Sequence, residues 1–591
     1  MSHYTHPSYK HLIDLSNDYP ERGQNWVIYS NNKDNNQLKE KAVSETKNTK
    51  SQIRLPIILA LAISAGIWIG ATFAEPKGNQ NDLRAALYKL QEIMTYVNRD
   101  YVDSVNTNEL VEYGITKMLE HLDPHSSYIP AKDASIVQSQ LDGEFDGIGV
   151  EFGIIRDTIY VVAPLTGGPS EALGIQSGDQ IIRVDGETMA GVGVTNRDVF
   201  EKLRGPKGSV VVVDMKRKNQ KELIEYRITR DKIPQYSINA SYMVNNEIGY
   251  IKVTRFAATT YDEFKESIAD LKSKGMKKLV IDLQGNPGGY MGAAINMADE
   301  LLGDKALIVS QEGKVEQYNQ KAYAFKPGMF EEGPVIVLVN EGSASASEIL
   351  AGAIQDNDRG LIVGRRSFGK GLVQMPIDLS DGAELRLTIA RYYTPSGRSI
   401  QKPYGANYEA YERDWLERYE HGEFFSADSV KFNDSLKYET VKGRTVYGGG
   451  GIMPDYFVPW DTTMSSAYVS KLFNSDASRE FILDYVNENK ATFENMTLDQ
   501  YYTDYMVSDA MLTKLVEYGK KNKVEFDSKD FNKSKEYLKI LVKAHLGRQI
   551  YDDSAFYKVV NDINEVYLQA IKLFDEAEKL ALATDLHNEE E

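Results

Sequence analysis

The spacing of apolar side chains changes several times along the chain, and each change predicts a different kind of structure. Between residues 81 and 121, leucine and methionine recur every three or four positions, which is the spacing of an amphipathic helix. The stretch LDPHSSYIP then interrupts this pattern with two prolines. We therefore expect a helical region at residues 78–140.

From Phe145 onward, the apolar runs become short and are separated by glycine, aspartate and proline. The runs are FDGIGVEFG, TIYVVAPL, QIIRVDG and SVVVVDMKR, and the stretch TNRDVFEKLRG between them predicts a short helix. Short apolar runs bounded by turn residues are typical of β-strands. This pattern predicts a compact β-rich module at residues 143–230.

In the next part of the chain, strand-like and helix-like patterns alternate. The strand runs are IGYIKVTRF, KKLVIDLQG, PVIVLVN and RGLIVGRRS, and the helical stretches between them are YDEFKESIADLKSKG, AAINMADELLG and SEILAGAIQDN. Alternation of this kind predicts an α/β domain whose mainly parallel strands are buried on both faces. We place this domain at residues 240–460, with an aromatic and charged insertion at 403–440, and expect a helical extension at 463–591.

One uncharged run, LPIILALAISAGIWIGATFA at residues 55–74, is long enough to cross a membrane. At about 1.5 Å per residue it spans roughly 30 Å, the thickness of a bilayer core. Lysines and Arg54 precede the run and Glu75 follows it, so the positive-inside rule places the N-terminus in the cytoplasm. We expect an uncleaved single-pass anchor in the inner (cytoplasmic) membrane. Residues 1–54 would form a disordered cytoplasmic tail, and the rest would lie on the periplasmic or extracytoplasmic side.

Composition narrows the possible chemistry. The formal net charge is −18 and no long basic run follows the N-terminal tail, which argues against nucleic-acid binding. The absence of cysteine excludes disulfides, a thiolate nucleophile and cysteine-based metal sites. His121 and His125 have the spacing of a metal-binding pair, but an Asp-Pro between them breaks the helix and no third ligand is evident. We expect no metal and no cofactor.

The stretch GSASASEIL, residues 342–350, contains three serines that could include a nucleophile. Ser345 and Glu348 also have the spacing of a capping box, so the same stretch could simply begin a helix. No histidine falls within residues 240–402, which leaves a Ser-His-Asp triad without support. A buried lysine can act as the base instead, and Lys370, between two glycines in SFGKGLVQ, is the candidate.

A glycine-rich turn, DLQGNPGGYMGAA at residues 282–294, follows one of the predicted strands and precedes a helix. Its backbone amides could bind a phosphate or the oxyanion of an acyl-transfer intermediate, or the turn could be no more than a tight connection. In a parallel sheet this turn, the serines and Lys370 would meet at the carboxyl ends of the strands.

In this order and spacing, the motifs resemble those of the C-terminal processing peptidases, or tail-specific proteases, of the membrane-anchored bacterial kind. The resemblance covers residues 81–460 and is carried by LDPHSSYIP, FDGIGVEFG with SGDQIIRVDG, DLQGNPGG, the run from GSASASEIL to SFGKGLVQ, RYYTPSGRSIQ and GGGIMPD. It implies a multidomain α/β protein. Such a protein has a crotonase-like α/β protease core, an inserted β-rich PDZ domain, an N-terminal helical region and a C-terminal helical extension.

The resemblance also implies roles for individual residues in catalysis. Ser345 matches the family's nucleophile, Lys370 its general base and Gln374 the glutamine that orients the lysine. The oxyanion amides are expected at Ala346 and at Gly288, with Gly289 as the alternative to Gly288.

One position departs from the family pattern, and two serines are left without a catalytic role. Gln284 stands where the family usually has arginine, so any ion pair made by that arginine is missing here. Ser343 and Ser347 are expected to act only as packing and turn residues.

The PDZ resemblance implies a site for a peptide C-terminus. The loop formed by Gly147, Ile148, Gly149 and Val150 would hold the terminal carboxylate, although it could be a plain β-turn. The helix that carries Val199, Phe200 and Leu203 would flank the side-chain pocket. Arg204 lies where the family often has an arginine that links the PDZ domain to the active site, and its alternative role is a solvated helix-end cation.

These features predict a membrane-anchored serine endopeptidase with a Ser-Lys dyad. Its partners would be proteins with exposed apolar C-termini, together with the membrane through residues 55–74. The C-terminal helices could form a homo-oligomer, dock an adaptor or cover the active site. Two alternatives are a catalytically inactive PDZ scaffold and another acyl-transfer hydrolase on the same fold.

Overall fold

The computed structural model describes residues 80–588, apart from positions 166, 219, 304, 406 and 407. The described chain divides into two units, one ending at Ile115 and the other beginning at Thr116. The first unit contains α2 (Gln80–Asp100) and most of α3 (Thr107–Glu120). The second unit contains everything discussed below.

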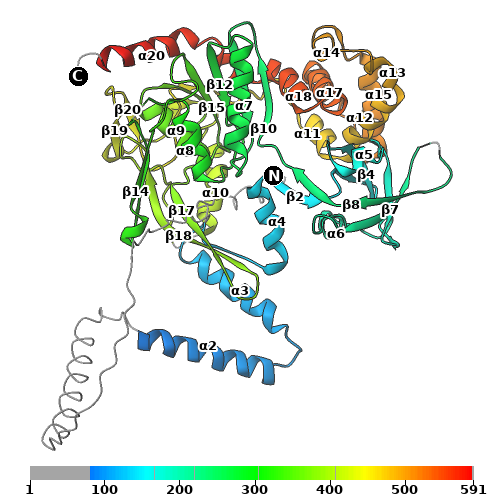
Figure 1. Ribbon diagram of the computed structural model, residues 1–591, viewed down its shortest axis with the longest axis horizontal. Helices are drawn as coiled ribbons and strands as arrows, with labels where there is room; N and C mark the ends of the chain where they lie inside the picture. The colour runs from blue at the N-terminus through cyan, green and yellow to red at the C-terminus, as the bar shows by residue number, and fades with distance from the viewer. Residues whose placement is uncertain (1–79, 166, 219, 304, 406–407, 589–591) are drawn as a thin grey trace, which may run out of the picture. The chain divides into compact units, whose positions relative to one another are not determined.

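A six-stranded sheet forms the centre of the second unit (Figure 1). Its order is β10 (Ile238–Met243), β11 (Ile248–Val253), β12 (Lys278–Asp282), β15 (Val335–Val339), β16 (Gly360–Gly364) and β21 (Tyr456–Phe457). Strand β10 is antiparallel to β11, and the remaining neighbours are parallel. The parallel arrangement agrees with the strand–helix alternation of the sequence. It brings the ends of β12, β15 and β16 to one edge.

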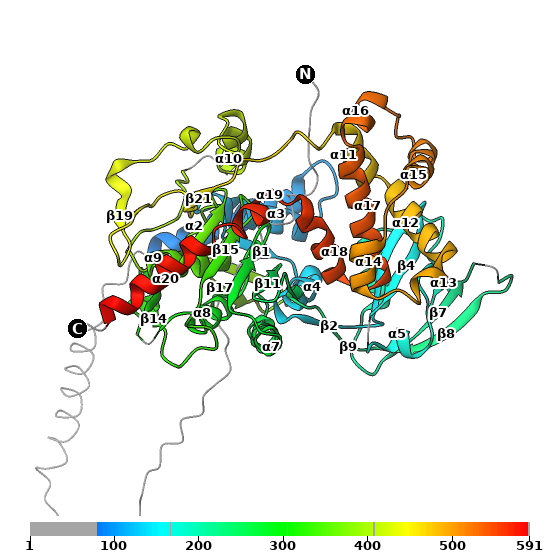
Figure 2. The same ribbon diagram turned by 90° about the horizontal axis from the view of Figure 1, so that it is seen from above.

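Helices cover both faces of this sheet, because its central strands are apolar on both sides. On one face the core includes side chains from α7 (Thr260–Ser273), α8 (Met291–Asp299) and α9 (Ala346–Asp356). On the other face it includes side chains from α19 (Glu565–Ala570) and α20 (Phe574–Asn588), the latter drawn in red in Figure 2. The last helices of the chain therefore belong to the α/β core, whereas the sequence predicted one extension over residues 463–591.

A second, antiparallel sheet extends the α/β core. Its strands are β1 (Ser127–Ile129), β18 (Glu384–Tyr393), β13 (Leu307–Gly313) and β14 (Gln320–Tyr323), with β17 (Leu372–Asp378) also paired to β18. The pairing of β1 with β18 joins the LDPHSSYIP stretch to this sheet. The predicted insertion contains α10 (Tyr408–Glu420) and the strand β19 (Lys437–Glu439), which pairs with β20 (Thr445–Tyr447).

The β-rich module forms an antiparallel sheet with a core of its own. The sheet order is β3 (Val150–Ile155), β4 (Thr158–Pro164), β5 (Gln180–Val184), β7 (Val210–Lys216) and β8 (Ile224–Thr229), and β6 (Glu187–Thr188) pairs with β5. Two helices complete it, α5 (Pro169–Ala172) and α6 (Asn196–Leu203). Strands β2 (Glu144–Gly147) and β9 (Asp231–Pro234) pair where the chain enters and leaves the module.

Residues 467–560 form a separate helical module with its own apolar core. Its helices are α11 (Ala467–Asn474), α12 (Asp476–Glu488), α13 (Lys490–Phe493), α14 (Leu498–Asp504), α15 (Asp509–Lys521), α16 (Ser528–Lys533), α17 (Lys535–Ile550) and α18 (Asp553–Val560). The architecture is thus mixed α/β, with a helical C-terminal region as expected. The crotonase-like description of the core stays a prediction.

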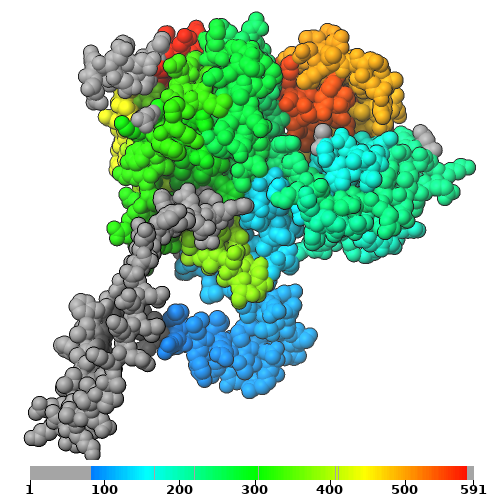
Figure 3. All heavy atoms as spheres, viewed as in Figure 1, coloured from blue at the N-terminus to red at the C-terminus, as the bar shows by residue number. Residues whose placement is uncertain are grey.

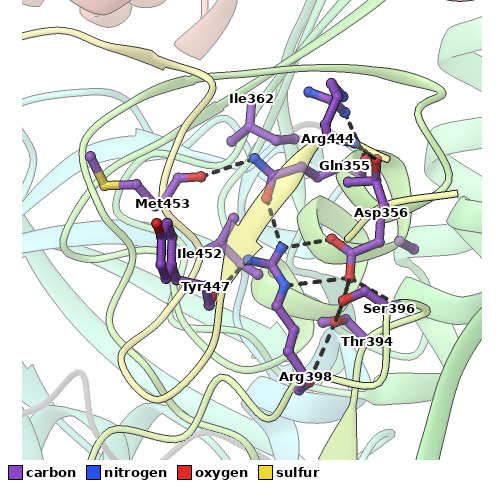
Figure 4. Close-up of polar contacts among 12 residues, drawn as sticks. Gln355, Asp356, Ile362, Thr394, Ser396, Arg398, Arg444, Tyr447, Ile452 and Met453 are labelled. Atoms are coloured by element: carbon purple, nitrogen blue, oxygen red, sulfur yellow. Dashed lines mark hydrogen bonds and ion pairs between the residues drawn. The ribbon is translucent and has the colours of Figure 1, made fainter. Parts of the chain in front are cut away.

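The late motifs RYYTPSGRSIQ and GGGIMPD meet at the C-terminal end of α9 (Figure 4). Arg398, from the first motif, is fully buried and donates to Asp356 at 2.7 Å and to Gln355 at 2.8 Å. Asp455, from the second motif, accepts from the side chain of Gln355 at 3.0 Å. A buried charge needs a partner of this kind, because its desolvation is otherwise uncompensated. The two motifs therefore fix the C-terminal end of α9, the helix that begins directly after Ser345.

The expected localisation has to be corrected. Within the part of the chain that the structure describes, no helix is both long and apolar enough to cross a bilayer. This finding overturns the placement of the protein as a single-pass inner-membrane protein. Residues 1–54 and 55–74, on which the predicted tail and anchor fall, lie outside the described residues.

Candidate active site

Three loops meet at the carboxyl ends of β12, β15 and β16. The first is the glycine-rich turn at 283–290, the second carries the serines at 340–345, and the third carries Lys370 at 365–371. Backbone hydrogen bonds join them, since the Ala344 amide donates to the Asn286 carbonyl at 3.0 Å and the Phe368 amide to the Ser343 carbonyl at 3.0 Å. The sheet therefore brings together segments that are far apart in the sequence.

Ser345 lies at a sharp turn between β15 and α9, in a strained backbone conformation. Its φ is 54° and its ψ is −113°, and it is the residue immediately before the helix. A non-glycine residue in such a region costs about 1–3 kcal/mol, and strain of this kind clusters at functional sites. In other hydrolases a strained strand-to-helix turn exposes a serine hydroxyl next to free helix amides. The geometry of Ser345 fits that arrangement.

The carboxylate of Glu348 joins the serine loop to the lysine loop. One oxygen accepts from the backbone amides of Ser345 and Lys370, each at 2.9 Å. The other accepts from the Gly369 amide at 2.7 Å and the Ser367 hydroxyl at 2.5 Å. The pKa of Glu348 is raised to about 7, because the effect of burial outweighs the four hydrogen bonds, which lower it. The sequence predicted Glu348 only as a helix cap, and its bonds to the lysine loop had no sequence signal.

Lys370 is buried, and a second side chain ties its backbone to that of Ser345. The hydroxyl of Tyr392, on β18, donates to the Lys370 carbonyl at 2.6 Å and to the Ser345 carbonyl at 3.2 Å. Glu348 and Tyr392 together bond the two backbones through both their amides and their carbonyls. The relative position of the two residues is therefore fixed by buried hydrogen bonds.

Gln374 lies on β17, and polar contacts connect its side chain to the LDPHSSYIP stretch. Its side-chain amide donates to the Thr388 hydroxyl at 3.2 Å, which in turn donates to Asp123 at 3.0 Å. Asp123 also accepts from the backbone amides of His125 and Ser126, each at 2.8 Å. The stretch that ends the N-terminal helical region thus supports the strand that carries Gln374.

His125, for which the sequence predicted no functional role, is buried in this region. Its Nε2 lies 2.8 Å from the hydroxyl of Tyr411 on α10, and its Nδ1 has no hydrogen-bond partner among the described residues. Burial lowers the pKa of His125 well below its usual value, and the positive charges of Lys370 and Lys402 lower it further. The available signal was its position inside a motif that the family resemblance had already singled out.

Gly288 packs directly against the turn of Ser345. Its φ is +101°, and a Cβ added there would lie 2.7 Å from the Cβ of Ser345 and 3.0 Å from the Ala346 nitrogen. Its amide donates to the side-chain oxygen of Asn286 at 2.8 Å. Ala346 is the first residue of α9 and is fully buried. Of the two expected oxyanion donors, the Gly288 amide is thus engaged by Asn286 in this conformation.

Ser343 and Ser347 are both fully buried and hydrogen-bonded to the glycine-rich turn. The Ser343 hydroxyl donates to the Leu283 carbonyl at 2.8 Å, and the Ser347 hydroxyl donates to the Asn286 carbonyl at 3.0 Å. These contacts occupy the two hydroxyls in holding the loops together, which matches the packing role expected for them.

Gln284, at the position that departs from the family pattern, lies beside a buried ion pair. The ammonium of Lys252 is 2.9 Å from Asp282 and donates to the Gln284 carbonyl at 2.6 Å. The Gln284 side chain accepts from Asn564 at 3.0 Å. A positive charge is therefore present at the start of the turn, supplied by β11.

The predicted carboxylate loop of the β-rich module turns its carbonyls inward. The Ile148 carbonyl accepts from the Ser170 hydroxyl at 2.5 Å, and the Gly149 carbonyl accepts from the Leu165 amide at 2.9 Å. In a trans peptide the N–H points opposite to the C=O. The amides of Gly149 and Val150 therefore point away from residues 165–170, as a nest for an anion requires.

The helix predicted to flank the peptide pocket contributes its side chains unequally. Val199 and Leu203 are buried in the core of the β-rich module. Phe200 is half-buried and meets Phe152 of β3 edge to face at 5.6 Å. Phe200, together with Phe152, thus faces the space between α6 and the open edge of β3.

Arg204 bridges this module and the helix α4 (Ala131–Asp142). Its guanidinium lies over the rings of Phe145 and Phe200, at 4.4 and 4.7 Å, and donates to Ser139 of α4 at 2.9 Å. The neighbouring Gln138 donates to the Tyr290 hydroxyl at 3.2 Å. Since Tyr290 follows the glycine-rich turn, a continuous set of contacts runs from α6 to the site.

Comparisons with known proteins agree with this geometry. The sequence model of peptidase family S41 matches residues 247–408, and the PDZ model matches residues 135–216. A family of unknown function (DUF8443) matches residues 468–552, within the helical module.

Two curated relatives are carboxy-terminal processing proteases. That of Bartonella bacilliformis is 36% identical over 348 residues, which are 58% of this chain and 79% of the relative. CtpB of Bacillus subtilis is 34% identical over 328 residues, which are 54% of this chain and 66% of the relative.

Among solved structures, the photosystem II D1 C-terminal processing protease is 31% identical, with a TM-score of 0.30, over 53% of this chain and 83% of that one. The sequence relatives and the family matches lead to one conclusion. The chain belongs to peptidase family S41, as a carboxy-terminal processing serine protease that carries a PDZ domain.

Proposed function

We propose that the protein cleaves polypeptides by a Ser-Lys acyl-enzyme mechanism, with Ser345 as nucleophile and Lys370 as general base. The observation that carries this proposal is the shared carboxylate of Glu348, which accepts from the amides of both residues at 2.9 Å. The strained turn supports the choice of Ser345 among the three serines. The hydroxyls of Ser343 and Ser347 are already committed to backbone carbonyls.

In the proposed reaction, neutral Lys370 takes the proton of the Ser345 hydroxyl as the oxygen attacks the carbonyl carbon of the scissile peptide. The resulting ammonium then gives that proton to the leaving amine, so the C–N bond breaks and an ester to Ser345 remains. Lys370 then takes a proton from water as the water oxygen attacks the ester. The bond between the acyl carbon and the Ser345 oxygen breaks, the ammonium of Lys370 returns the proton to that oxygen, and the acid leaves. Gln374 positions the lysine from β17.

The amide of Ala346, at the N-terminus of α9, is the proposed first oxyanion donor. The second comes from the glycine-rich turn. The Gly288 amide can serve only after its 2.8 Å hydrogen bond to Asn286 is released. Gly289 remains the alternative donor.

The proposed substrates are proteins with exposed, flexible, apolar C-termini. The terminal carboxylate would bind the loop Gly147–Val150, and the tail would add as a strand to the open edge of β3. Phe152 and Phe200 would contact the terminal side chain. We call the space between α6 and the edge of β3 the tail-binding groove. Arg204 would transmit its occupancy toward Tyr290 through Ser139 and Gln138.

A cleavage assay tests the proposal. An unstructured protein that ends in apolar residues should be cut by the wild-type chain and left intact by Ser345→Ala. Equal survival with both enzymes would refute proteolysis by this site and favour the inactive PDZ scaffold. An acyl-transfer activity on small esters that survives deletion of residues 143–230 would instead favour the other hydrolase.

A further inference from the structure

The helical module packs against the outer face of the PDZ sheet, on strand β4 (Figures 1 and 3). The side chain of Gln549, on α17, donates to the Val162 carbonyl at 2.7 Å. Ion pairs surround this contact, namely Arg156–Glu480 at 2.6 Å, Lys218–Asp484 at 3.2 Å and Arg548–Glu151 at 3.4 Å. The module is thus held against the domain proposed to bind substrate tails.

A cavity of about 480 Å³ lies between the two partners. The PDZ side contributes β3 residues 151–155 together with Tyr160 and Val162 of β4. The helical module contributes apolar side chains and two arginines, among them Phe473, Ile482, Arg479 and Arg548. Asn196, the first residue of α6, also lines it. The cavity therefore reaches from the outer face of the sheet to the mouth of the tail-binding groove.

Strand geometry determines which side chains of a bound tail would face this cavity. Ile159 and Val161 of β4 are fully buried in the PDZ core, whereas Tyr160 and Val162 point to the opposite face and line the cavity. A peptide added to the edge of β3 alternates in the same way. If its last side chain faces α6 and Phe200, the side chains one and three positions earlier face the helical module.

The charges at the cavity favour an acidic side chain there. The Arg479 side chain is 62% exposed and only loosely paired, with Asp476 at 3.8 Å. Arg548 pairs with Glu151 and Asp553. Burial lowers the pKa of His545 to about 4, with help from the two arginines, so this residue is neutral at pH 7. Among the described residues that line the cavity, Arg479 is therefore the cation whose ion pair is the longest.

We propose that the helical module forms a second wall of the tail-binding groove and that Arg479 selects an acidic side chain one or three positions before the substrate's C-terminal residue. The inference rests on the proposed recognition of C-termini by the PDZ domain. It gives the helical module a role in substrate specificity.

Peptide binding to the full chain tests this proposal, with Ser345→Ala in every protein to prevent cleavage. Fluorescence anisotropy would compare ten-residue peptides with the same apolar terminal residue and with Glu, Ala or Lys at the two positions. We expect the Glu peptide to bind about tenfold more tightly than the Lys peptide, as one well-formed charge pair allows. Arg479→Glu should remove or reverse the preference for the Glu peptide over the Lys peptide.

Two controls separate the possible failures. Lys529→Glu makes the same charge change on α16, outside the cavity lining, and should leave the preference intact. Equal binding of the Glu and Lys peptides would overturn the inference, and the proposed function would stand if an amidated peptide still bound more weakly. Equal binding of the free and amidated peptides would overturn tail recognition itself, and the inference with it.

Discussion

Replacing Ser345 by glycine should stabilise the protein relative to replacing it by alanine. Both changes remove the hydroxyl, but only glycine relieves the backbone at φ 54° and ψ −113°. The strain is worth about 1–3 kcal/mol, and the extra freedom of glycine in the unfolded chain costs about 0.4–1 kcal/mol. We therefore expect Ser345→Gly to be more stable than Ser345→Ala by about 1 kcal/mol.

Urea unfolding followed by tryptophan fluorescence would measure this difference, provided that the free energy of unfolding of both variants falls equally steeply with urea concentration. Ala269→Gly, made in the Ser345→Ala background, is the matched control. Ala269 is exposed within α7, where a change from alanine to glycine should cost about 1 kcal/mol. If Ser345→Gly is destabilised relative to Ser345→Ala as Ala269→Gly is, the turn stores no strain and the reasoning fails.

Three further predictions concern the surroundings of the site. Gly288→Ala should reduce cleavage by about a hundredfold or more, because its Cβ would lie 2.7 Å from that of Ser345; Gly292→Ala, with open space around its Cβ, should retain activity. Arg398→Met should cost about 3–5 kcal/mol in urea unfolding, because it leaves Asp356 charged and buried; a loss below 1 kcal/mol would contradict the ion-pair assignment. The raised pKa of Glu348, about 7, means that the folded state holds this proton more tightly than the unfolded chain does. As the pH rises from 5 to 8, the free energy of unfolding of the wild type should therefore fall by about 2–3 kcal/mol relative to that of Glu348→Gln. A constant difference between the two proteins across that range would show that Glu348 does not titrate there.

Sequence patterns predicted the features that depend on interactions between residues close together in the chain. Strand–helix alternation predicted the parallel sheet, because consecutive buried strands need crossover helices. That sheet brings the turn of Ser345 and the loop of Lys370 to the same edge, as expected. Spacing also predicted the carboxylate half of the Glu348 capping box.

Contacts between distant segments could not be predicted in this way. The bonds from Glu348 to Gly369 and Lys370 join positions more than twenty residues apart, and capping geometry carries no information about them. His125 contacts Tyr411, which lies 286 positions later in a segment without clear periodicity. The sequence pattern of α19 and α20 resembles that of the helical module. Their place in the α/β core is visible only in the structure, where they pack on one face of the six-stranded sheet.

The most direct test of the account is the position of the covalent intermediate. A peptide ester with an apolar acyl group would be mixed with the wild-type chain, quenched in acid during turnover and mapped by tandem mass spectrometry. The account predicts an acyl group on Ser345, absent from Ser345→Ala and strongly reduced in Lys370→Ala. An acyl group on Ser343 or Ser347, or turnover without any adduct, would contradict it.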